Sequence, residues 1–221
     1  FKKGDQVYGL TGFGLGAYAD YKCMKESDSV QGCLALKPTS ASHEEASMLA
    51  YGGLLAFQYV EKGKIQAGQH VLIYGGSGTT GTIAIQYAKY LGAKVTAVCG
   101  TKHLELSKSL GADVTLDYTA QETVPPGTQY DFMLDAVGKA KTSKLRTACK
   151  KALLPTGIYA TIDDGNLLLD SKRLDLIKEL VDAGHIKAVL DKTFGFEEMV
   201  SAHRYVETCH KAGGIAVTVN V

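Results

Sequence analysis

The sequence has little net charge and no long apolar run. Among its 221 residues, 24 lysines and arginines nearly balance 23 aspartates and glutamates. No basic stripe interleaved with aromatic residues is present, so a dedicated nucleic-acid-binding protein is not expected. No apolar stretch reaches the length of a membrane-spanning helix, so membrane insertion is not expected either. With 45% hydrophobic and 21% charged residues, the composition is typical of a globular chain with a packed core.

Cysteine is sparse and irregularly placed. There are five cysteines, and no two of them have Cys-x-x-Cys spacing. An odd and scattered set does not indicate a disulfide framework. Because reduced thiols are usual in the cytosol, we expect a cytoplasmic protein.

The middle of the chain alternates between strand and helix patterns from His70 onward. The apolar patterns predict strands over 70–74, 94–99, 113–118, 130–137 and 157–162, with helices over 82–91, 102–110 and 141–153 between them. Thr101 is the expected N-cap of the second of these helices. Successive strand–helix units predict an α/β fold with a parallel sheet and right-handed crossovers.

The two ends of the chain have a different pattern. Phe1 opens the turn-and-strand pattern "FKKGDQVYG", so we expect further sequence upstream, and residues 1–37 read as short strands and glycine turns. Ser42 and Glu45 have capping-box spacing, which predicts a helical region to about Val60. After Asp163 the pattern predicts a helix over 171–184, a strand over 186–194, a helix over 196–210 and a strand over 213–221.

The segment "VLIYGGSGTTGTIAIQYAKYLGA" contains a glycine motif of dinucleotide-binding type. Gly76, Gly78 and Gly81 fit G-x-G-x-x-G, and the motif follows a predicted strand and precedes a predicted helix. Such glycines allow a tight turn, a close approach of backbone to a pyrophosphate, and helix packing on the strand. The N–H groups and dipole at the helix start favour phosphate. The residues expected at the pyrophosphate are Gly76, Ser77, Gly78, Thr79, Thr80 and Gly81.

The glycine motif has two other interpretations. A P-loop would have lysine after the last glycine, where Thr82 stands, so a nucleotide triphosphatase is not expected. A glycine turn without a ligand is the alternative, but the coincidence of strand, glycines and helix favours a dinucleotide.

The end of the second predicted strand indicates which dinucleotide. Sites for NAD usually have an acidic residue there, but Cys99 and Gly100 occupy this position and no acidic residue occurs between Gly81 and Glu105. Thr101 and Lys102 follow, and both can bind a 2′-phosphate. We therefore predict NADPH rather than NADH; the alternative is that Lys102 only faces solvent.

These motifs together resemble the zinc-independent, quinone-oxidoreductase branch of the medium-chain dehydrogenase/reductase superfamily, which includes zeta-crystallin-like proteins. The matching segments occur in the order of the family and cover almost the whole chain. They are "KKGDQVYG", "GAYADY", "EEASMLAYGGLLAF", "GQHVLIYGGSGTTGTIAIQYAKYLGAKVTAV", "SLGADVTLDY", "YDFMLDAVG" and "AGHIKAVLDKTFGFEEMVSAHRYVE".

The resemblance implies two domains. A Rossmann-type, doubly wound parallel sheet that binds NADP would span residues 41–168. A GroES-like β-barrel catalytic domain would be built from residues 1–40 and 169–221. This barrel would be partial, because family members carry a further stretch before "KKGDQVYG".

The resemblance also implies an oxidoreductase that works without zinc. The four-cysteine lobe of zinc-dependent relatives is absent after "GDQV", and Tyr51 lies about where those relatives have a zinc-ligating cysteine. Hydride would pass from NADPH to a quinone or an α,β-unsaturated carbonyl, acceptors that need less Lewis-acid help than ketones. Two alternatives stay open: an NADP-binding protein with little catalysis, in a regulatory or structural role, and an NADP-dependent alcohol dehydrogenase.

The remaining site residues are carried over from the family motifs. Tyr118 would lie near the adenosine end, and Ala136, Val137 and Gly138 would border the nicotinamide. Tyr51 is the candidate proton donor to the acceptor, or else packs at a helix–sheet junction. Asp135 either binds backbone near the cofactor or serves the turn, and His203 is expected to be structural. Leu55 departs from the family, which often has threonine there.

The family also suggests partners. A homodimer would form through the edge strand "GIYATI" of the nucleotide-binding sheet. Binding of single-stranded RNA, known among zeta-crystallin-like proteins, is a minor alternative.

Overall fold

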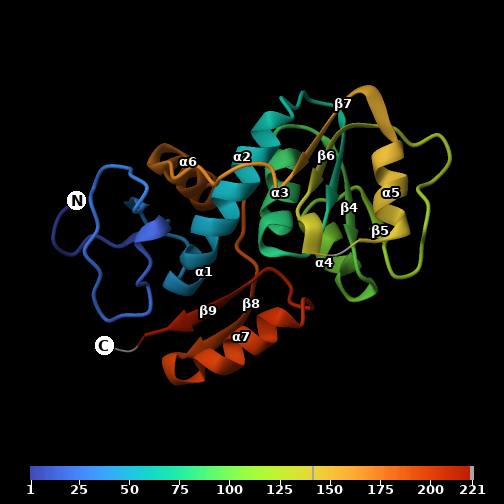
Figure 1. Ribbon diagram of the computed structural model, residues 1–221. Coiled ribbons are helices and arrows are strands. Elements are labelled where there is room, and N and C mark those ends of the chain that lie inside the picture. The colour runs from blue at the N-terminus through green and yellow to red at the C-terminus, as the bar shows by residue number, and fades with distance from the viewer. Residues whose placement is uncertain (141, 220–221) are drawn as a thin grey trace. The chain divides into compact units, whose positions relative to one another are not determined.

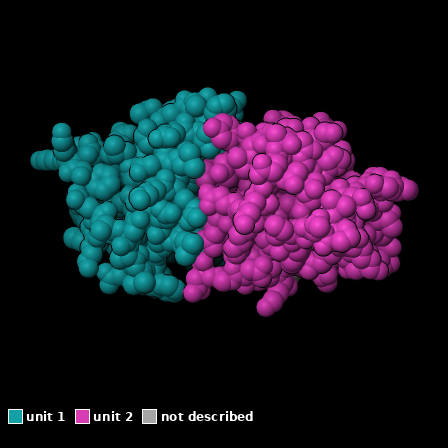
Figure 2. Space-filling model, turned by 90° about the horizontal axis from the view of Figure 1, so that it is seen from above, with its two compact units in different colours: residues 1–54, 167–221 teal, residues 55–166 magenta. Residues whose placement is uncertain are grey.

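The computed structural model of the protein describes residues 1–140 and 142–219, and the chain divides into two compact units (Figure 2). Unit 1 comprises Phe1–Leu54 and Leu167–Val221, and unit 2 comprises Leu55–Asn166. The sequence placed the borders at 40/41 and 168/169. The first border differs because the helical region after Ser42 begins inside unit 1, where α1 (His43–Met48) packs against strands of that unit.

Unit 2 is built on a sheet of five parallel strands in the order β5-β4-β3-β6-β7 (Figure 1). The central strand β3 (His70–Tyr74) lies between β4 (Lys94–Cys99) and β6 (Tyr130–Asp135). The edges are β5 (Val114–Asp117) and β7 (Leu153–Thr161). This order, in which the chain runs outward one way from β3 and then the other, confirms the predicted doubly wound fold.

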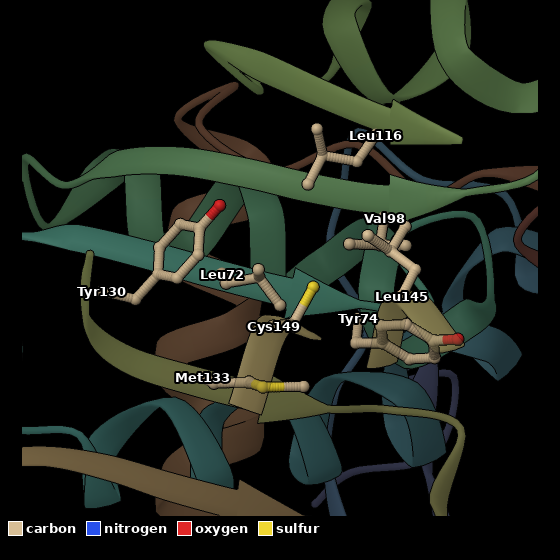
Figure 3. Close-up of a cluster of buried hydrophobic side chains, with 8 residues drawn as sticks. All are labelled: Leu72, Tyr74, Val98, Leu116, Tyr130, Met133, Leu145 and Cys149. Carbon is tan, nitrogen blue, oxygen red and sulfur yellow. The ribbon is translucent and has the colours of Figure 1, made fainter. Parts of the chain in front are cut away.

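Helices cover both faces of this sheet. On one face, α5 (Lys144–Lys151) closes a buried cluster that holds side chains from four strands, shown in Figure 3. The members drawn there are Leu72, Tyr74, Val98, Leu116, Tyr130, Met133, Leu145 and Cys149. On the other face lie α2 (Leu54–Lys62) and α3 (Thr79–Tyr90), joined by the stacked rings of Phe57 and Tyr87, with α4 (Leu104–Ser109) beside them. None of the helices within residues 1–140 and 142–219 has the length and apolar character needed to cross a membrane.

The predicted ends of several elements in unit 2 need correction. Helix α3 begins at Thr79 rather than at 82, directly after the glycine loop. Strand β7 begins at Leu153 rather than at 157, and its pairing with β6 shifts register before Phe132. Pro155 is compatible with this early start because an edge strand can spare a backbone N–H. Lys141, part of the predicted helix over 141–153, lies outside the described residues.

As far as residue 219, unit 1 contains two small sheets and three α-helices. Strands β1 (Val7–Leu10) and β2 (Cys33–Leu36) are antiparallel, whereas β8 (Leu190–Gly195) and β9 (Gly214–Thr218) are parallel. Helices α6 (Ser171–Asp182) and α7 (Met199–Glu207) complete it with α1. The strand expected over 186–194 starts only at Leu190, and residues 220–221 of the last predicted strand lie outside the described residues.

The predicted capping box at the first helix is confirmed. The Glu45 amide donates to Ser42 Oγ (3.2 Å), and the Ser42 amide donates to Glu45 Oε2 (2.8 Å). The helical run that starts here contains a π-helical turn over Leu49–Gly53 before it continues as α2. In unit 1, a Cβ on Gly53 would lie 2.8 Å from Ile177 Cδ1, so glycine allows α6 to pack closely on this turn.

Asp182 ties the end of α6 to the loop before α1. Its carboxylate accepts hydrogen bonds from the Thr39 hydroxyl, the Ser40 amide and the Ser40 hydroxyl, each at 3.0 Å, and pairs with Lys178 at 2.9 Å. Burial opposes the charged form, but Lys178 and the hydrogen bonds outweigh it and hold the pKa of Asp182 well below its usual range. The carboxylate therefore stabilises the folded chain above its unfolded pKa, near 4, and this contribution is lost as the pH falls below that value.

We expect Asp182→Asn to lower the free energy of unfolding at pH 7 by about 2 kcal/mol, because hydrogen bonds to a charged acceptor are lost. Each kcal/mol corresponds to a fall of about 2–4 °C in melting temperature for a chain of this size. Calorimetry at pH 7 and at pH 3 measures the effect, and the difference from the unmodified protein should shrink at pH 3. Glu179→Gln, an exposed position on the same helix, is the matched control; an equal effect there would contradict the assignment.

Candidate nucleotide-binding site

The predicted cofactor-binding residues of unit 2 lie at one edge of its sheet. They follow the carboxyl ends of β3, β4, β5 and β6, which meet at the same edge because all strands are parallel. The order of the strands reverses between β3 and β6, and ligands of such sheets bind at this switch point. The loops after these two strands touch there, since a Cβ on Gly75 would lie 2.7 Å from Val137 Cγ2.

The turn after β3 depends on two glycines. Gly75 has φ of +89°, a conformation that side chains rarely adopt, and its amide and that of Gly76 both donate to Val98 O (2.9 Å each). Gly81 lies in α3 where a Cβ would be 2.1 Å from Gly75 O, so only glycine lets the helix pack on the turn. The sequence motif assigned the tight turn to the glycines of G-x-G-x-x-G, whereas the left-handed residue is Gly75, directly before it.

Gly78 has neither of these reasons to be glycine. Its φ of −78° and ψ of 171° suit any residue, and the nearest atom to a Cβ built there is Gly75 O at 3.6 Å. A side chain would fill the space beside the start of α3 without a clash inside the protein. This open position fits a pyrophosphate that approaches the backbone.

The first turn of α3 is available to an anion. Its N-cap is Gly78, which offers no side-chain acceptor to the N–H groups of the turn, and no acidic residue lies in that turn. Ser77, Gly78 and Thr79 are partly exposed, whereas Thr80 is buried. The helix dipole and the absence of a side-chain cap at Gly78 together favour negative charge at this position.

The loop after β4 is organised by a carboxylate from the neighbouring strand. Thr101 Oγ1 donates to Asp117 Oδ2 (2.5 Å), and Thr119 donates to Asp117 Oδ1 through its amide (2.8 Å) and its hydroxyl (2.6 Å). The expectation that Thr101 caps the following helix is wrong: the segment Thr101–His103 is a 3-10 turn whose N-cap is Gly100, and no side chain caps it or α4. The Thr101 hydroxyl binds Asp117 instead, because the adjacent parallel strand brings that carboxylate within reach.

The environment of Asp117 keeps it ionised. Its side chain is 7% exposed, and burial alone would favour the neutral acid. The hydrogen bonds from Thr101 and Thr119 outweigh burial and lower the pKa of the carboxyl. A negative charge is therefore held at the ends of β4 and β5, next to exposed Lys102 and to Tyr118, which is 41% exposed.

The loop after β6 is held by a buried ion pair. Asp135 is fully buried, and its Oδ1 accepts the amides of Val137 (3.2 Å) and Gly138 (3.1 Å). Its Oδ2 accepts the Tyr159 hydroxyl (2.8 Å) and pairs with Arg146 of α5. Asp135 thus serves the turn that contains Ala136, Val137 and Gly138, one of the two roles considered for it.

Arg146 is the cation that makes a buried carboxylate tolerable here. Its side chain is 12% exposed and lies beside the ring of Tyr74. Burial alone would lower the pKa of the guanidinium, but its contacts with Tyr159 and Asp135 raise it. Arg146 therefore stays a cation beside Asp135, and this contact fixes the turn that follows β6.

The candidate catalytic residue lies in unit 1. Tyr51 belongs to the π-helical turn, and its side chain is 54% exposed rather than packed away. Its role as proton donor stays a prediction. His203, on α7, is 3.3 Å from the Tyr18 hydroxyl through Nε2 and meets that ring edge-on, which agrees with a structural role. Leu55 is buried in unit 2.

Three residues of the site were missed from the sequence. Gly75 was overlooked because it precedes the motif, although the double glycine "GG" signals a turn. Asp117 was overlooked because an acidic residue was sought only at the end of the second strand. Arg146 carried no signal, because a single arginine in a helix reads as solvent-exposed. Within the described residues, no three His, Cys, Asp or Glu side chains group in a way that could hold a metal ion.

Comparison with known proteins places this arrangement in a family. Two family models, both described as zinc-binding dehydrogenase, match residues 79–153 and 164–217. The 2-methylene-furan-3-one reductase of Solanum lycopersicum is 32% identical, with 98% of this chain covered, and the chloroplastic NADPH-dependent alkenal/one oxidoreductase of Arabidopsis thaliana is 31% identical, also with 98% covered. The chain spans 58% of the length of each of these relatives.

Solved structures agree with the fold. An alcohol dehydrogenase superfamily protein from Novosphingobium aromaticivorans superposes with a TM-score of 0.80 at 26% identity, with 100% of this chain and 76% of that chain covered. The order of motifs, the doubly wound sheet and the matches to both halves of the chain agree with one another. The chain belongs to the medium-chain dehydrogenase/reductase superfamily, in which it is similar to quinone and alkenal oxidoreductases.

Proposed function

We propose that the protein is an NADPH-dependent oxidoreductase that transfers hydride to a quinone or an α,β-unsaturated carbonyl without zinc. The observation that carries the proposal is the uncapped start of α3 at the switch point of the sheet, where Gly78 leaves room for a pyrophosphate. Lys102, at the end of the neighbouring strand β4, supports a cofactor with a 2′-phosphate. The two plant relatives, a 2-methylene-furan-3-one reductase and an alkenal/one oxidoreductase, support the class of reaction.

Each group of residues has a separate part in this proposal. The N–H groups of the glycine loop and of the first turn of α3 bind the pyrophosphate, and Lys102 with Tyr118 binds the 2′-phosphate and adenosine end. The loop of Ala136, Val137 and Gly138, fixed by Asp135, borders the nicotinamide. NADPH, when bound, supplies the hydride, and the protein supplies its orientation. Tyr51 is proposed to donate the proton to the acceptor.

Turnover tests the reaction class directly. The purified protein should oxidise NADPH in the presence of a simple quinone or a 2-alkenal, followed at 340 nm, and should leave simple ketones largely unreduced. Tight NADPH binding without any turnover would favour the alternative of a binding protein with little catalysis. Reduction of simple ketones at a comparable rate would favour the alcohol dehydrogenase alternative.

Lys102→Ala tests the choice of cofactor. Loss of a cation that pairs with a phosphate should weaken NADPH binding about tenfold or more and leave NADH binding within about twofold. Fluorescence titration gives both dissociation constants. Lys94→Ala, at the opposite end of the same strand, is the matched control and should change neither constant. NADH binding as tight as NADPH binding, with an unchanged ratio in Lys102→Ala, would falsify the NADPH assignment.

Three further features complete the proposal. Metal analysis of active protein should find no stoichiometric zinc.

Two copies of the chain are proposed to pair through β7, an edge strand of unit 2 whose Ile158 is 39% exposed. Light scattering that finds only monomer would contradict this pairing. A cytoplasmic location stays a prediction.

A further inference from the structure

We propose that Asp117 is a positioning residue for NADPH selectivity: with the hydroxyls of Thr101 and Thr119 it fixes the two residues, Lys102 and Tyr118, that face the 2′-phosphate and adenosine end. This proposal rests on the proposed function and deepens it at the end of the site that faces the 2′-phosphate. Thr101, Asp117 and Thr119 are called the Asp117 cluster below.

The position of the cluster in the chain gives the first argument. Thr101 directly precedes Lys102, and Asp117 directly precedes Tyr118. The hydrogen bond from Thr101 Oγ1 to Asp117 Oδ2 (2.5 Å) therefore joins the two segments at the residues next to the proposed ligand-binding side chains. A second bond, from the Tyr118 amide to Cys99 O (3.1 Å), joins the same segments through the backbone.

The count of protons gives the second argument. Three short contacts involve the two threonine hydroxyls: Thr101 to Asp117 (2.5 Å), Thr119 to Asp117 (2.6 Å), and Thr101 to Thr119 (2.9 Å). Each hydroxyl has one proton, and an ionised carboxylate accepts only. Whichever way the two hydroxyls point, the single proton of Thr101 is used within the cluster and none is left to donate to a phosphate. Thr101 acts through the cluster rather than as a direct ligand.

The packing around Tyr118 gives the third argument. A Cβ on Gly100 would lie 3.5 Å from Tyr118 Cε1 and 3.6 Å from the hydroxyl oxygen, so the ring lies along the backbone that leads to Lys102. The amide of Asp117 is in turn held by Gln121 Oε1 (2.8 Å), and the Gln121 amide donates to Asp117 O (2.9 Å). Tyr118 is thus placed from both sides, while its side chain stays 41% exposed.

Pre-organisation is the physical consequence. Lysine carries much side-chain entropy, and a mobile backbone below it would add to what must be ordered on binding. Because the Asp117 cluster already fixes the backbone below Lys102 and Tyr118, this backbone loses little further conformational entropy when the cofactor binds. Because only NADPH places a phosphate at this position, the benefit falls on NADPH and not on NADH.

The test compares two substitutions of Thr101. Thr101→Val removes the hydroxyl at constant shape and should weaken NADPH binding about tenfold, with NADH binding changed less than about twofold. Thr101→Ser keeps the hydroxyl and should retain the affinity for NADPH. Thr115→Val, the same change on the same strand as Asp117, is the matched control and should change neither constant. Thr119→Val, which removes the other hydroxyl that donates to Asp117, should act in the same direction as Thr101→Val.

The dissociation constants from fluorescence titration, together with melting temperatures, separate the outcomes. An equal loss of NADH and NADPH affinity in Thr101→Val, or no loss at all, overturns the positioning role. If Lys102→Ala shifts the NADPH/NADH ratio and Thr101→Val does not, the positioning proposal fails while the proposed function stands. If Lys102→Ala itself leaves the ratio unchanged, both fail. Should Thr101→Val not fold, Thr119→Val gives the same readout.

Discussion

Gly81→Ala is expected to destabilise unit 2 strongly. An added Cβ would lie 2.1 Å from the backbone oxygen of Gly75 and 2.9 Å from Gly76 Cα. Neither atom can move without opening the turn between β3 and α3, and this turn is fixed by the two amides that bind Val98 O. Overpacking in a core costs about 1–3 kcal/mol and occasionally more, and a backbone clash belongs at the upper end. The expected loss is at least about 3 kcal/mol.

Gly78→Ala gives the contrasting result. A Cβ there meets only Gly75 O at 3.6 Å, and the backbone angles suit alanine. The folded chain should lose no more than about 1 kcal/mol, the difference between glycine and alanine at an N-cap. Binding of NADPH should nevertheless fall by about tenfold or more, because the methyl group occupies the approach to the first turn of α3.

Chemical denaturation and fluorescence titration on both variants test this pair together. The site is supported if the two variants differ in what they lose. Gly81→Ala should have a lower free energy of unfolding, whereas Gly78→Ala should keep its stability and bind NADPH more weakly. If Gly78→Ala binds NADPH as tightly as the unmodified protein, the pyrophosphate does not approach this loop. If Gly81→Ala melts at the same temperature, the close packing of α3 on the turn is contradicted.

Arg146→Met is expected to have the second large effect. The substitution keeps a long apolar side chain next to Tyr74 but leaves the Asp135 carboxylate, which is fully buried, without its cation. Removal of one partner of a buried ion pair costs about 3–5 kcal/mol, because an uncompensated charge stays in the interior.

The free energy of unfolding, measured by denaturation with urea, gives the size of this effect. Arg204→Met, the same change on the exposed face of α7, is the control and should cost less than about 0.5 kcal/mol. Arg146→Lys keeps a charge but not the planar group, and an intermediate loss is expected. Equal stability of Arg146→Met and Arg204→Met would show that the buried pair contributes nothing.

Much of unit 2 follows from local pattern. The apolar run "VLIY" and the alternation of strands with helices predict a parallel sheet, and the parallel order places the carboxyl end of every strand at one edge. The glycine motif could be read because backbone conformation and close packing are demands on single residues at fixed spacing. The same holds for the capping box of Ser42 and Glu45, whose two hydrogen bonds span three residues.

The partners of polar side chains could not be read in this way. Thr101 looked like a helix cap because a threonine before a helix usually is one, yet its hydroxyl binds Asp117, sixteen residues away in sequence. The Arg146–Asp135 ion pair and the hydrogen bonds from Thr39 and Ser40 to Asp182 likewise join residues that only the folded chain brings together.

The sequence by itself determined the α/β order and the position of the glycine loop, because these depend on periodicity and on residue types at fixed spacing, and its motifs carried the resemblance to the family. Only the tertiary structure decided that the left-handed turn residue is Gly75, that the first helical region begins inside unit 1, and that Thr101 serves a buried carboxylate. The physical reason is that such contacts form between neighbouring strands and helices. A local sequence pattern does not predict which side chains the pairing of the strands will bring next to one another.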